Sequence, residues 1–494
     1  MKKNQVIVIG SGNAAMCAAI AALEKGASVL MLEKANRKEF GGNSRYTAGA
    51  MRFAYNDFED LKPLLKNPTD ERLGRTDFGS YPKTKFLADL KHFNEGEPLT
   101  ALQNFLVEES LPTIQWLASH NVRFDPIYSR QTFQKEGKYI FWGGLTLESE
   151  GEGDGLVQAE LKEFIRLGGK IKYNCNVQSL LHENGTVIGV RYRNRGKDME
   201  VKSDAVVIAS GGFEANKALR IKYLGSNWAK ARVRGTRHNQ GAGIEMAQSV
   251  GASLNGHFGG CHATPMDLNM PEYGNLNIPH IERKHYRKIS YLFGVMLNAN
   301  GDRFVDEGAD FRNYTYAQFG KAVLEQPKQF AWQVFDAKVY PLLYGEYKTA
   351  DASFVEADTL EDLVQKLKGI PAEKALATLN AYNEAVNLDK SFDPTIKDGK
   401  NTIGLALPKS NWANRLDTPP FRAYPVTGGI TFTYGGVKVN RGGAVLNEKD
   451  EPIAGLFACG EMVGGVFFYG YPGGSGLTSG AVFGRAAGYS AAAQ

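Results

Sequence analysis

The sequence predicts an α/β fold built around a buried parallel sheet, and three observations indicate it. Residues 5–9 (QVIVI) form a short β-branched apolar run, and an alanine-rich segment with helical spacing follows at residues 14–25. A second apolar strand pattern at residues 27–32 (ASVLML) completes a βαβ unit. Two further runs, at residues 204–208 and 453–459, are also typical of buried strands. Strands that alternate with helices in this way favour a parallel sheet covered by helices.

The composition is typical of a globular protein and argues against several functional classes. The chain has 494 residues, of which 43% are apolar and 22% charged, so two or three domains are expected. A net charge of +5, without basic runs, gives no support for nucleic-acid binding. The 4 cysteines lie far apart and form no CxxC pattern, so we expect no iron–sulfur cluster, c-type haem or disulfide framework. Neither a signal peptide nor a long apolar span is recognisable, which predicts a cytoplasmic protein.

The loop after the first strand has the spacing of a dinucleotide-binding motif. It reads GSGNAA at residues 10–15, where Gly10 makes the turn and Gly12 lets the backbone approach a pyrophosphate. The N-terminus of the following helix offers free N–H groups to the phosphates. Glu33, at the end of the second strand, is placed to accept hydrogen bonds from ribose hydroxyls. The complete order of strand, loop, helix, strand and acid therefore predicts a bound dinucleotide.

Glycine clusters elsewhere in the chain indicate that this dinucleotide is FAD. Residues 41–44 (GGNS) and 47–49 (TAG) follow the βαβ unit, and residues 209–212 (ASGG) follow a later strand. A strand that ends in Gly460-Glu461 can place its acid beside ribityl or ribose hydroxyls. The closing run at residues 473–477 (GGSGL) precedes a helix whose N-terminal N–H groups would face the anionic end of a reduced flavin.

These four clusters, in this order, resemble the fumarate reductase/succinate dehydrogenase flavoprotein superfamily, and the resemblance covers essentially the whole chain. It implies a Rossmann-like, discontinuous FAD-binding domain over residues 1–260 and 416–494, with an inserted α+β cap domain over residues 261–415. Membrane-complex members carry a histidine covalently bonded to FAD where this chain has Arg45, which implies noncovalent FAD here. The residues expected to contact FAD lie in and around these clusters: Gly10, Gly12, Asn13, Ala14, Glu33, Lys34, Gly41, Gly42, Asn43, Ser44, Thr47, Ala48, Gly49, Val177, Ala209, Ser210, Gly211, Gly460, Glu461, Ser475, Gly476 and Leu477.

The expected cap has its own strand and helix patterns. An apolar strand is predicted at residues 294–298 (GVMLN), and residues 359–367 and 372–386 are typical of amphipathic helices. The proline-containing linker at residues 416–420 (LDTPP) is expected to cross back to the FAD domain. Outside the cap, a helical stretch near residues 84–121 is expected to pack against the FAD domain.

Desaturation by a flavin requires removal of a proton α to a carbonyl and transfer of the β hydrogen as hydride to flavin N5. His262 stands where the superfamily has a substrate-binding His-Pro-Thr segment, so it is a candidate carboxylate ligand; a structural histidine is the alternative. Residues 301–307 (GDRFVDE) are similar to a superfamily block that precedes a proton-transferring arginine. Arg312, one position late, is the candidate here, coupled to Glu307 and Asp310; an exposed ion pair with Asp310 is the alternative.

Other positions depart from the superfamily pattern. The residues that relay protons in fumarate reductases fall near Arg287 and Ser290, so that relay is absent. The superfamily's histidine falls at Phe432 and its carboxylate-binding arginine falls at Tyr471, so a plain fumarate reductase is not expected. Tyr471 can instead donate to an enolate-like oxygen as the α proton leaves, with simple aromatic packing as the alternative.

One branch of the superfamily, the FAD-dependent tricarballylate dehydrogenase family, is similar to this chain in several stretches: residues 41–55 (GGNSRYTAGAMRFAY), 306–316 (DEGADFRNYTY), 332–338 (WQVFDAK), 408–416 (PKSNWANRL) and 471–476 (YPGGSG). Its members oxidise tricarballylate to cis-aconitate and pass electrons to a separate membrane-associated partner. A tricarboxylate carries about three negative charges at pH 7 and needs cations and donors around it. We expect such a small anionic carboxylate to be bound by some of the following residues: Arg287, Arg312, His262, Arg45 and Arg52.

Three alternatives stay open. The Tyr-Pro-Gly sequence at residues 471–473 also resembles the 3-ketosteroid dehydrogenases, in which that tyrosine polarises a ketone. The polar stretch at residues 281–288 (IERKHYRK) favours an anionic substrate instead, unless its charges only coat the cap surface. The other two alternatives are a fumarate reductase-like enoate reductase and a non-enzymatic FAD-binding assembly module.

Overall fold

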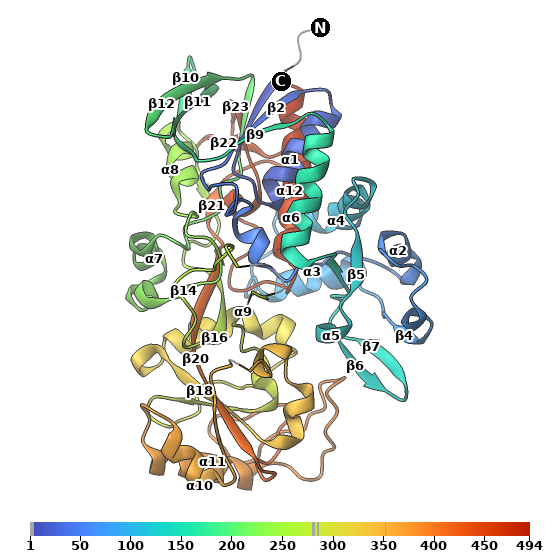
Figure 1. The fold of residues 1–494 in the computed structure, drawn as a ribbon, viewed down its shortest axis with the longest axis vertical. Coiled ribbons are helices and arrows are strands. Elements are labelled where there is room, and N and C mark those ends of the chain that lie inside the picture. Colours follow the sequence, from blue (N-terminus) through green and yellow to red (C-terminus); the bar gives the residue numbers. More distant parts are fainter. Residues whose placement is uncertain (1–3, 279–281, 284–285, 351) are drawn as a thin grey trace.

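A nine-stranded sheet contains the N-terminal βαβ unit in the computed structural model, which describes residues 4–278, 282–283, 286–350 and 352–494 (Figure 1). The central strand β1 (Gln5–Ile9) lies between β13 (Ala205–Ile208) and β2 (Ser28–Leu32) and is parallel to both. Strand β23 (Pro452–Ala458) extends the parallel region beyond β13, and β9 (Lys170–Lys172) extends it beyond β2. The predicted strands and their parallel arrangement are therefore confirmed.

An antiparallel extension continues this sheet on one side. Strands β10 (Cys175–Glu183), β11 (Thr186–Asn194) and β12 (Lys197–Lys202) pair in sequence, and β22 (Ala444–Leu446) pairs with β23. Their inward residues join the buried core of the first sheet, whereas β12 is largely exposed.

Two helices rich in small residues, alanine in one and glycine and alanine in the other, pack closely on the parallel sheet. Helix α1 (Asn13–Glu24) lies along α12 (Ser475–Ala492), and a Cβ on Gly484 or Gly488 would meet the carbonyl oxygen of Ala14 at 2.5 Å or of Ala18 at 2.1 Å. Only glycine therefore lets the two backbones approach this closely. Helix α6 (Glu152–Arg166) also packs on α1, and α4 (Ala101–Ser119) packs on α12.

The helical stretch expected near residues 84–121 consists of two helices, α3 (Lys83–His92) and α4. Helix α4 begins with a capping box, in which the Thr100 side chain accepts from the Gln103 backbone and the Gln103 side chain accepts from the Thr100 backbone. This capping box satisfies the first N–H groups of a new helix, so the chain turns between the two segments instead of continuing as one helix.

A second, six-stranded sheet forms around the long strand β20 (Phe421–Thr433). Its partners are β14 (Arg232–Val233), β16 (Cys261–Asp267), β18 (Ala331–Phe335) and β19 (Val355–Ala357), and β17 (Val295–Asn298) pairs with β18. Strands β14 and β20 belong to this sheet although they lie outside residues 261–415, so the proposed domain division stays a prediction.

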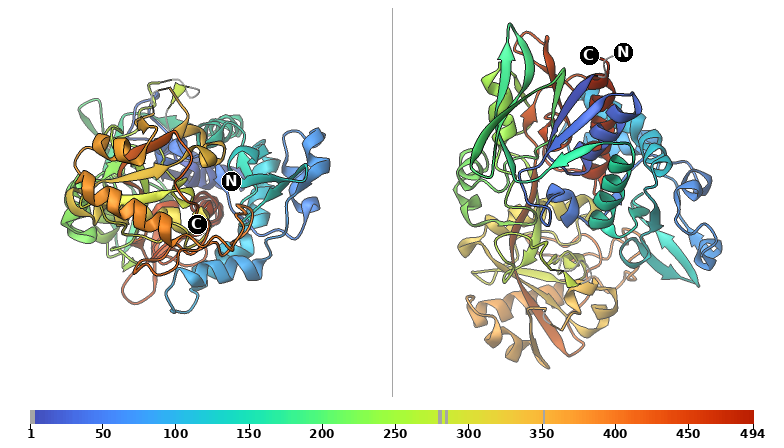
Figure 2. Two further views of the ribbon diagram at one scale, coloured as in Figure 1. Left: turned by 90° about the horizontal axis from the view of Figure 1, so that it is seen from below. Right: turned by 45° about the horizontal axis from the view of Figure 1, so that its top comes forward.

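The predicted amphipathic helices α10 (Leu360–Lys366) and α11 (Ala372–Ala385) cover the second sheet. They lie at the end of the molecule opposite the C-terminus (Figures 1 and 2). Helix α9 (Arg312–Leu324) packs on β16 and β20 from another side, and there Gly320 has no space for a Cβ because Thr264 lies within 2.6 Å.

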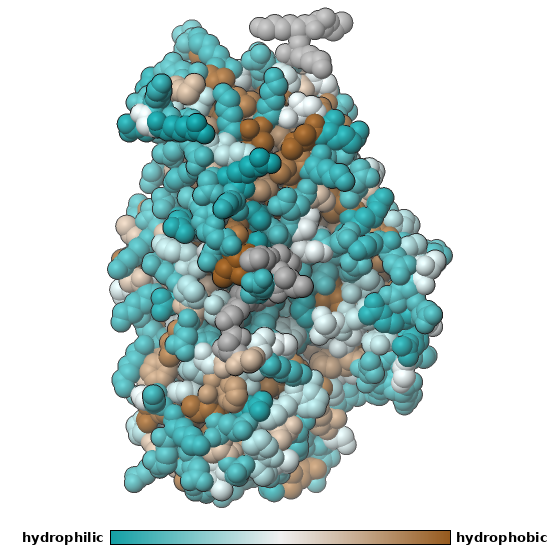
Figure 3. Space-filling view, in the orientation of Figure 1, coloured by the Kyte–Doolittle hydropathy of each residue, from teal (hydrophilic) through white to brown (hydrophobic). Residues whose placement is uncertain are grey.

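The remaining strands and α-helices of the described residues are short, and these strands form three further small sheets. They are β3 (Ala50–Met51), α2 (Phe58–Leu61), β4 (Thr76–Asp77), β5 (Phe124–Pro126), α5 (Tyr128–Gln131), β6 (Thr132–Lys135), β7 (Lys138–Phe141), β8 (Leu147–Ser149), α7 (Lys217–Leu224), α8 (Ala242–Ser249), β15 (Leu254–Asn255) and β21 (Gly436–Val437). In the described part of the chain, no helix has both the length and the apolar character needed to cross a membrane. The surface in Figure 3 is mostly hydrophilic.

Candidate active site

Two adjoining cavities lie beside the glycine motifs. The first, of about 140 Å³, is lined by the loop at Gly10 and by Glu33; we call it the loop cavity. The second, of about 200 Å³, is lined by four arginines and is called the arginine cavity; these arginines are Arg130, Arg234, Arg287 and Arg312. Both cavities share one set of lining residues, namely Ala14, Asn43, Ser44, Gly460 and Glu461. An elongated dinucleotide can therefore extend from one cavity into the other.

The loop cavity has the features that a pyrophosphate and a ribose need. Gly10 has a φ of +104°, and a Cβ there would meet the Ala209 carbonyl oxygen at 2.4 Å, so the turn requires glycine. Gly12 is the N-cap of α1 and has no side chain with which to cap it. The Asn13 N–H donates to Ser44 Oγ (3.0 Å), and the following N–H groups of the first turn can face an anion. Glu33 accepts from Ser11 Oγ and from the Ala35 backbone N–H (2.6 Å to its Oε1), beside the cavity that it lines. These residues fit FAD.

Most of the residues predicted to contact FAD line one or both cavities. The loop cavity is lined by Gly10, Gly12, Ala14, Glu33, Lys34, Gly42, Asn43, Ser44, Val177, Ala209, Ser210, Gly211, Gly460 and Glu461. The arginine cavity adds Asn13, Thr47, Ala48, Gly476 and Leu477. Gly41, Gly49 and Ser475 line neither cavity: the two glycines have positive φ in tight turns, and Ser475 Oγ donates to the Pro472 carbonyl oxygen (2.5 Å).

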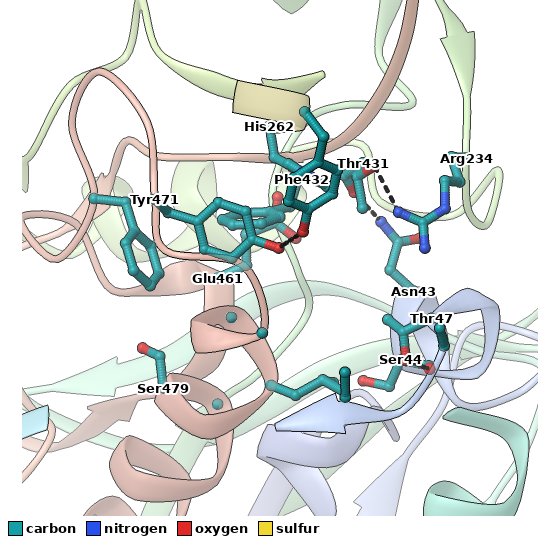
Figure 4. A pocket seen from close by; sticks show the side chains of 18 of the residues that line it. Asn43, Ser44, Thr47, Arg234, His262, Thr431, Phe432, Glu461, Tyr471 and Ser479 are labelled. Atoms are coloured by element: carbon teal, nitrogen blue, oxygen red, sulfur yellow. Dashed lines mark hydrogen bonds between the residues drawn. The ribbon is translucent and has the colours of Figure 1, made fainter. Parts of the chain in front are cut away.

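All four predicted catalytic residues line the arginine cavity. His262 comes from β16, Arg287 from the segment that follows β16, Arg312 from the first turn of α9, and Tyr471 from the loop before α12. Each of these side chains is buried. Figure 4 shows His262 and Tyr471 on the same side of the cavity, opposite Ser44 and Thr47. The fold therefore brings together residues that are up to 209 positions apart in the sequence.

Two further arginines in the cavity, Arg130 and Arg234, were not predicted from the sequence. Arg130 forms an ion pair with Glu148 and donates to the Ala48 carbonyl oxygen (3.0 Å). Arg287 likewise forms an ion pair with Glu346, with Nε 2.9 Å from Oε1. Arg234 follows the two-residue strand β14, which carries no recognisable motif, so only the pairing of β14 with β20 reveals its position.

Arg234 and Arg312 are buried without a carboxylate in ion-pair contact among the described residues. Arg234 Nη1 donates to Thr431 Oγ1 at 3.4 Å (Figure 4), and its Nε has no partner there. Burial and the nearby Arg287 lower the pKa of Arg234 to about 10. A guanidinium with this pKa is still charged at pH 7, and a buried charge without a counter-ion indicates a site for an anion.

Arg312 is held by aromatic rings instead of acids. Its guanidinium carbon lies 3.9 Å from the ring centroid of Tyr344 and 4.7 Å from that of Trp142. Burial lowers the pKa of Arg312, and Arg130 contributes in the same direction. Arg312 is 4% exposed, which excludes the alternative of a solvent-exposed ion pair.

The expected coupling of Arg312 to Glu307 and Asp310 is wrong. Glu307 turns toward the second sheet, where it forms an ion pair with Arg303 and accepts from the Met296 backbone N–H (2.8 Å). Asp310 forms an ion pair with Lys397 at 3.2 Å. The loop before α9 therefore directs both carboxylates away from the cavity, because each already has another cationic partner, Arg303 or Lys397.

Arg45 and Arg52 do not line the arginine cavity. Arg45 forms an ion pair with Asp154 beneath the glycine-rich turn. Arg52 is fully buried and donates from Nε to the Gly473 carbonyl oxygen (2.7 Å) and from Nη1 to the Gly143 carbonyl oxygen (2.7 Å). These two arginines therefore support the loops around the cavity and are not among its cations.

The polar stretch at residues 281–288 points partly inward. Residues 281, 284 and 285 lie outside the described residues. Arg287 lines the arginine cavity, and Lys288 is 2% exposed with its Nζ 3.6 Å from Asp267. At these two positions the charged side chains are therefore buried and do not simply coat the surface.

Aromatic residues surround His262 in the wall of the arginine cavity. The rings of Tyr316, Tyr471 and Phe432 lie 5.0, 4.9 and 5.4 Å from the His262 ring, between centroids. Neither ring nitrogen of His262 has a hydrogen-bond partner within the described chain. Burial and the charge of Arg234 lower the pKa of His262 well below its ordinary value, so the ring is neutral at pH 7.

The hydroxyl groups of Tyr316 and Tyr471 form a pair with 2.6 Å between their oxygens, marked at Tyr471 in Figure 4. Burial raises the pKa of both phenols. One hydrogen lies between the two oxygens, so the second hydrogen is available to a ligand. Tyr316 was not predicted, although it stands four residues after Arg312, where the helical period places both side chains on one face of α9.

Comparison with known proteins identifies related sequences and structures. The family described as "FAD binding domain" matches residues 5–477. The chain is 27% identical to the NADH:fumarate oxidoreductase of Klebsiella pneumoniae (strain 342), over 99% of this chain and 48% of that protein, and so spans about half of its length. It is also 27% identical to the 4-oxocyclohexanecarboxylate 2-dehydrogenase of Sinomonas cyclohexanicum, over 98% of this chain and 93% of that protein. The structure of 3-ketosteroid delta1-dehydrogenase from Sterolibacterium denitrificans has the same fold, with a TM-score of 0.75 and 20% identity over 99% of this chain and 100% of that chain.

Proposed function

Since the chain belongs to the FAD binding domain family, within the fumarate reductase/succinate dehydrogenase flavoprotein superfamily, we propose that it is an FAD-dependent dehydrogenase acting on a CH–CH bond of a small anionic carboxylate. The observation that carries this proposal is the pair of buried arginines, Arg234 and Arg312, without a carboxylate partner in the described part of the chain. A buried guanidinium gains most from a carboxylate ligand that is itself removed from water.

The specific reaction proposed is the oxidation of tricarballylate to cis-aconitate. Four arginines line the cavity, and two of them already pair with Glu148 and Glu346, so the site keeps a positive excess for a substrate with about three negative charges. The stretches that resemble the tricarballylate dehydrogenase family support the same substrate. We further propose that FAD is bound noncovalently and that a separate electron-acceptor protein, membrane-associated as in that family, reoxidises it.

The residues of the arginine cavity divide into three roles. When bound, FAD would supply the acceptor for the hydrogen that leaves the substrate as hydride. Arg234 and Arg287 hold carboxylate groups, and the aromatic wall keeps water away from the reacting carbons. Arg312 takes the α proton; this requires its neutral form, which the lowered pKa makes more accessible than in water. The hydroxyl pair of Tyr316 and Tyr471 donates to the oxygen on which negative charge develops.

The hydroxyl pair also favours a second candidate, the desaturation of a ketone. Tyr316 and Tyr471 are neutral donors beside Phe432, an arrangement that suits a carbonyl oxygen on an apolar body. Enoate reduction uses the same residues in the reverse direction, with Arg312 donating the proton. The arginines make a carboxylate the first choice among these substrates.

Anaerobic mixing of the FAD-loaded protein with candidate substrates tests the proposal. Tricarballylate is expected to bleach the yellow flavin absorbance, with succinate, 4-oxocyclohexanecarboxylate and a 3-ketosteroid as the competing compounds. Bleaching by a ketone alone would select the second candidate. If no carboxylate or ketone bleaches the flavin, the dehydrogenase proposal fails and the assembly module becomes the better explanation.

Arg312→Lys tests the acid/base role. It is expected to slow bleaching by about 100-fold or more, the usual contribution of a positioned acid or base, while FAD stays bound. Arg303→Lys, at an arginine whose side chain is 5% exposed and which lines neither cavity, is the matched control and should leave the rate unchanged. Unchanged bleaching in Arg312→Lys would show that another group moves the proton.

A further inference from the structure

Two carboxyl groups, those of Glu214 and Glu461, meet where the loop cavity and the arginine cavity adjoin. Glu461 lines both cavities and is partly open to them (Figure 4). Glu214 is fully buried in the loop after β13. A Cβ on Gly212 would lie 2.2 Å from Glu461 Oε1, so the loop that carries Glu214 packs directly against the second acid.

The four oxygens of these two carboxyl groups differ in their hydrogen bonds. Glu214 Oε1 accepts from the side-chain amides of Asn43 and Asn239, each at 2.6 Å. Glu461 Oε1 accepts from the backbone N–H of Thr433 (2.7 Å) and from its hydroxyl (3.0 Å). Glu214 Oε2 is buried, and no donor group of the described residues reaches it. The only polar role left for this oxygen is that of a donor, which requires a proton.

The proton belongs on Glu214. Burial, together with the adjacent Glu461, raises the pKa of Glu214 well above its ordinary value. Burial also raises the pKa of Glu461, but hydrogen bonds from Glu214 and Thr433 act in the opposite direction. The two carboxyl groups are therefore hydrogen-bond partners, with the protonated acid donating to the ionised one.

The other titratable groups near the pair do not neutralise it. Arg220 uses Nη1 to bind the backbone carbonyl oxygen of Glu214 (2.6 Å), not its carboxyl group. Burial raises the pKa of the Cys261 thiol, and Glu214 adds to this effect, so the thiol stays protonated. Arg234 reaches the pair only through Thr431 and Asn43, since Asn43 donates to the Thr431 carbonyl oxygen (2.6 Å) and Arg234 to the Thr431 hydroxyl.

We propose that Glu214 is a positioning residue of the FAD site: its protonated carboxyl donates to Glu461 and holds that carboxylate as an acceptor for hydroxyl groups of FAD. Glu461 lines both cavities, so its carboxylate can meet hydroxyl groups of FAD while Thr433 and Glu214 hold it in place. The inference concerns cofactor binding in the FAD family and does not depend on which substrate is oxidised.

Infrared difference spectroscopy on the FAD-loaded protein tests where the proton resides. At pH 7 the wild-type protein should show the carbonyl stretch of a protonated carboxylic acid that disappears in Glu214→Gln. Glu160→Gln is the matched control, because Glu160 is also buried with a raised pKa but lines neither cavity. It should remove a different band. If the Glu214→Gln spectrum keeps every acid band of the wild type, the proposal is overturned.

FAD affinity, measured by fluorescence on the apoprotein, tests the positioning role. Glu214→Gln keeps a donor and should bind FAD within about threefold of wild type, whereas Glu214→Leu removes the donor and should bind about 10- to 100-fold more weakly. Glu160→Gln should match wild type. Equal affinities for the Gln and Leu variants would overturn the proposal. If Glu214→Leu fails to fold, Glu461→Gln is the second test. Because this variant removes the neighbouring negative charge, the acid band of Glu214 should titrate at a lower pH than in the wild-type protein, and a band that titrates at the same pH would refute the pair.

Discussion

Replacing Arg234 by methionine should make the protein more stable and its substrate affinity much lower. Arg234 is 9% exposed, and within the described residues its guanidinium makes one long hydrogen bond, 3.4 Å to Thr431 Oγ1. Its Nε has no partner in the described chain. Methionine keeps an unbranched apolar stem of similar reach and removes only the charged group.

The magnitude follows from the cost of burying the charge. Since each pKa unit corresponds to about 1.4 kcal/mol, a pKa lowered from 12.5 to about 10 means that the charged form of Arg234 is disfavoured by about 3 kcal/mol. Arg234→Met should therefore raise the free energy of unfolding of the substrate-free protein, by at most this amount. A carboxylate that loses a buried cationic partner should bind about 30- to 4,000-fold more weakly, equivalent to about 2–5 kcal/mol.

Denaturant unfolding and anaerobic titration of the oxidised flavoprotein with tricarballylate measure the two effects. Arg303→Met is the control with the opposite expectation, because it leaves the buried Glu307 without its cation and should cost about 3–5 kcal/mol of stability with unchanged affinity. If Arg234→Met destabilises the protein as much as Arg303→Met does, or binds substrate as wild type does, the reasoning from an uncompensated charge is refuted.

Three further predictions concern buried groups. Because burial lowers the pKa of His262 well below its ordinary value, the ring stays neutral near pH 7. Carboxylate affinity near neutral pH should therefore show the same pH dependence in wild type and in His262→Asn, and a titration lost in the variant would contradict this. Tyr316→Phe and Tyr471→Phe should each slow single-turnover flavin bleaching by about 100-fold, and the double variant no further, since the hydroxyls act as a pair; additive losses would contradict this. Burial raises the pKa of Glu160, so its contribution is complete below its unfolded-state pKa and is lost as pH rises toward the folded-state value. Urea unfolding of Glu160→Gln should therefore depend less on pH than that of wild type, and identical curves would disprove the assignment.

The local parts of the fold were predictable from the sequence because they depend on neighbouring residues. The strand, glycine loop and helix at residues 5–25 follow from apolar periodicity and from a turn that only glycine can make. The break between α3 and α4 was missed because a capping box competes with a continuous helical pattern. The domain division and the individual roles of the site residues stay predictions.

The active-site arginines show why the rest was harder to predict. Arg312 was found through a motif, but Arg234 reaches the cavity only because β14 pairs with the distant end of β20, where Val233 lies opposite Ile430. Arg130 and Tyr316 likewise have no local signature for a site. Conversely, Arg45 and Arg52 are close in sequence to the glycine motifs yet do not line the cavity. Arg45, in the 3-10 turn at Gly42–Tyr46, binds Asp154 and backbone carbonyls, and Arg52, just after β3, binds the carbonyls of Gly473 and Gly143.

The long strand β20 limits what the enzyme can accommodate. It spans 13 residues, about 40 Å at the usual rise, and four other strands hold it along its length. Its first residue, Phe421, pairs with β19, and its last, Thr433, holds Glu461 at the cofactor end (Figure 1). The end of β20 lines the arginine cavity, so a ligand too large for the cavity would displace this end of the strand and, with it, Thr433. The size of a substrate is therefore limited, because Thr433 must keep its position to hold Glu461 beside the cofactor. A protein with a wider cavity would need another residue to hold Glu461.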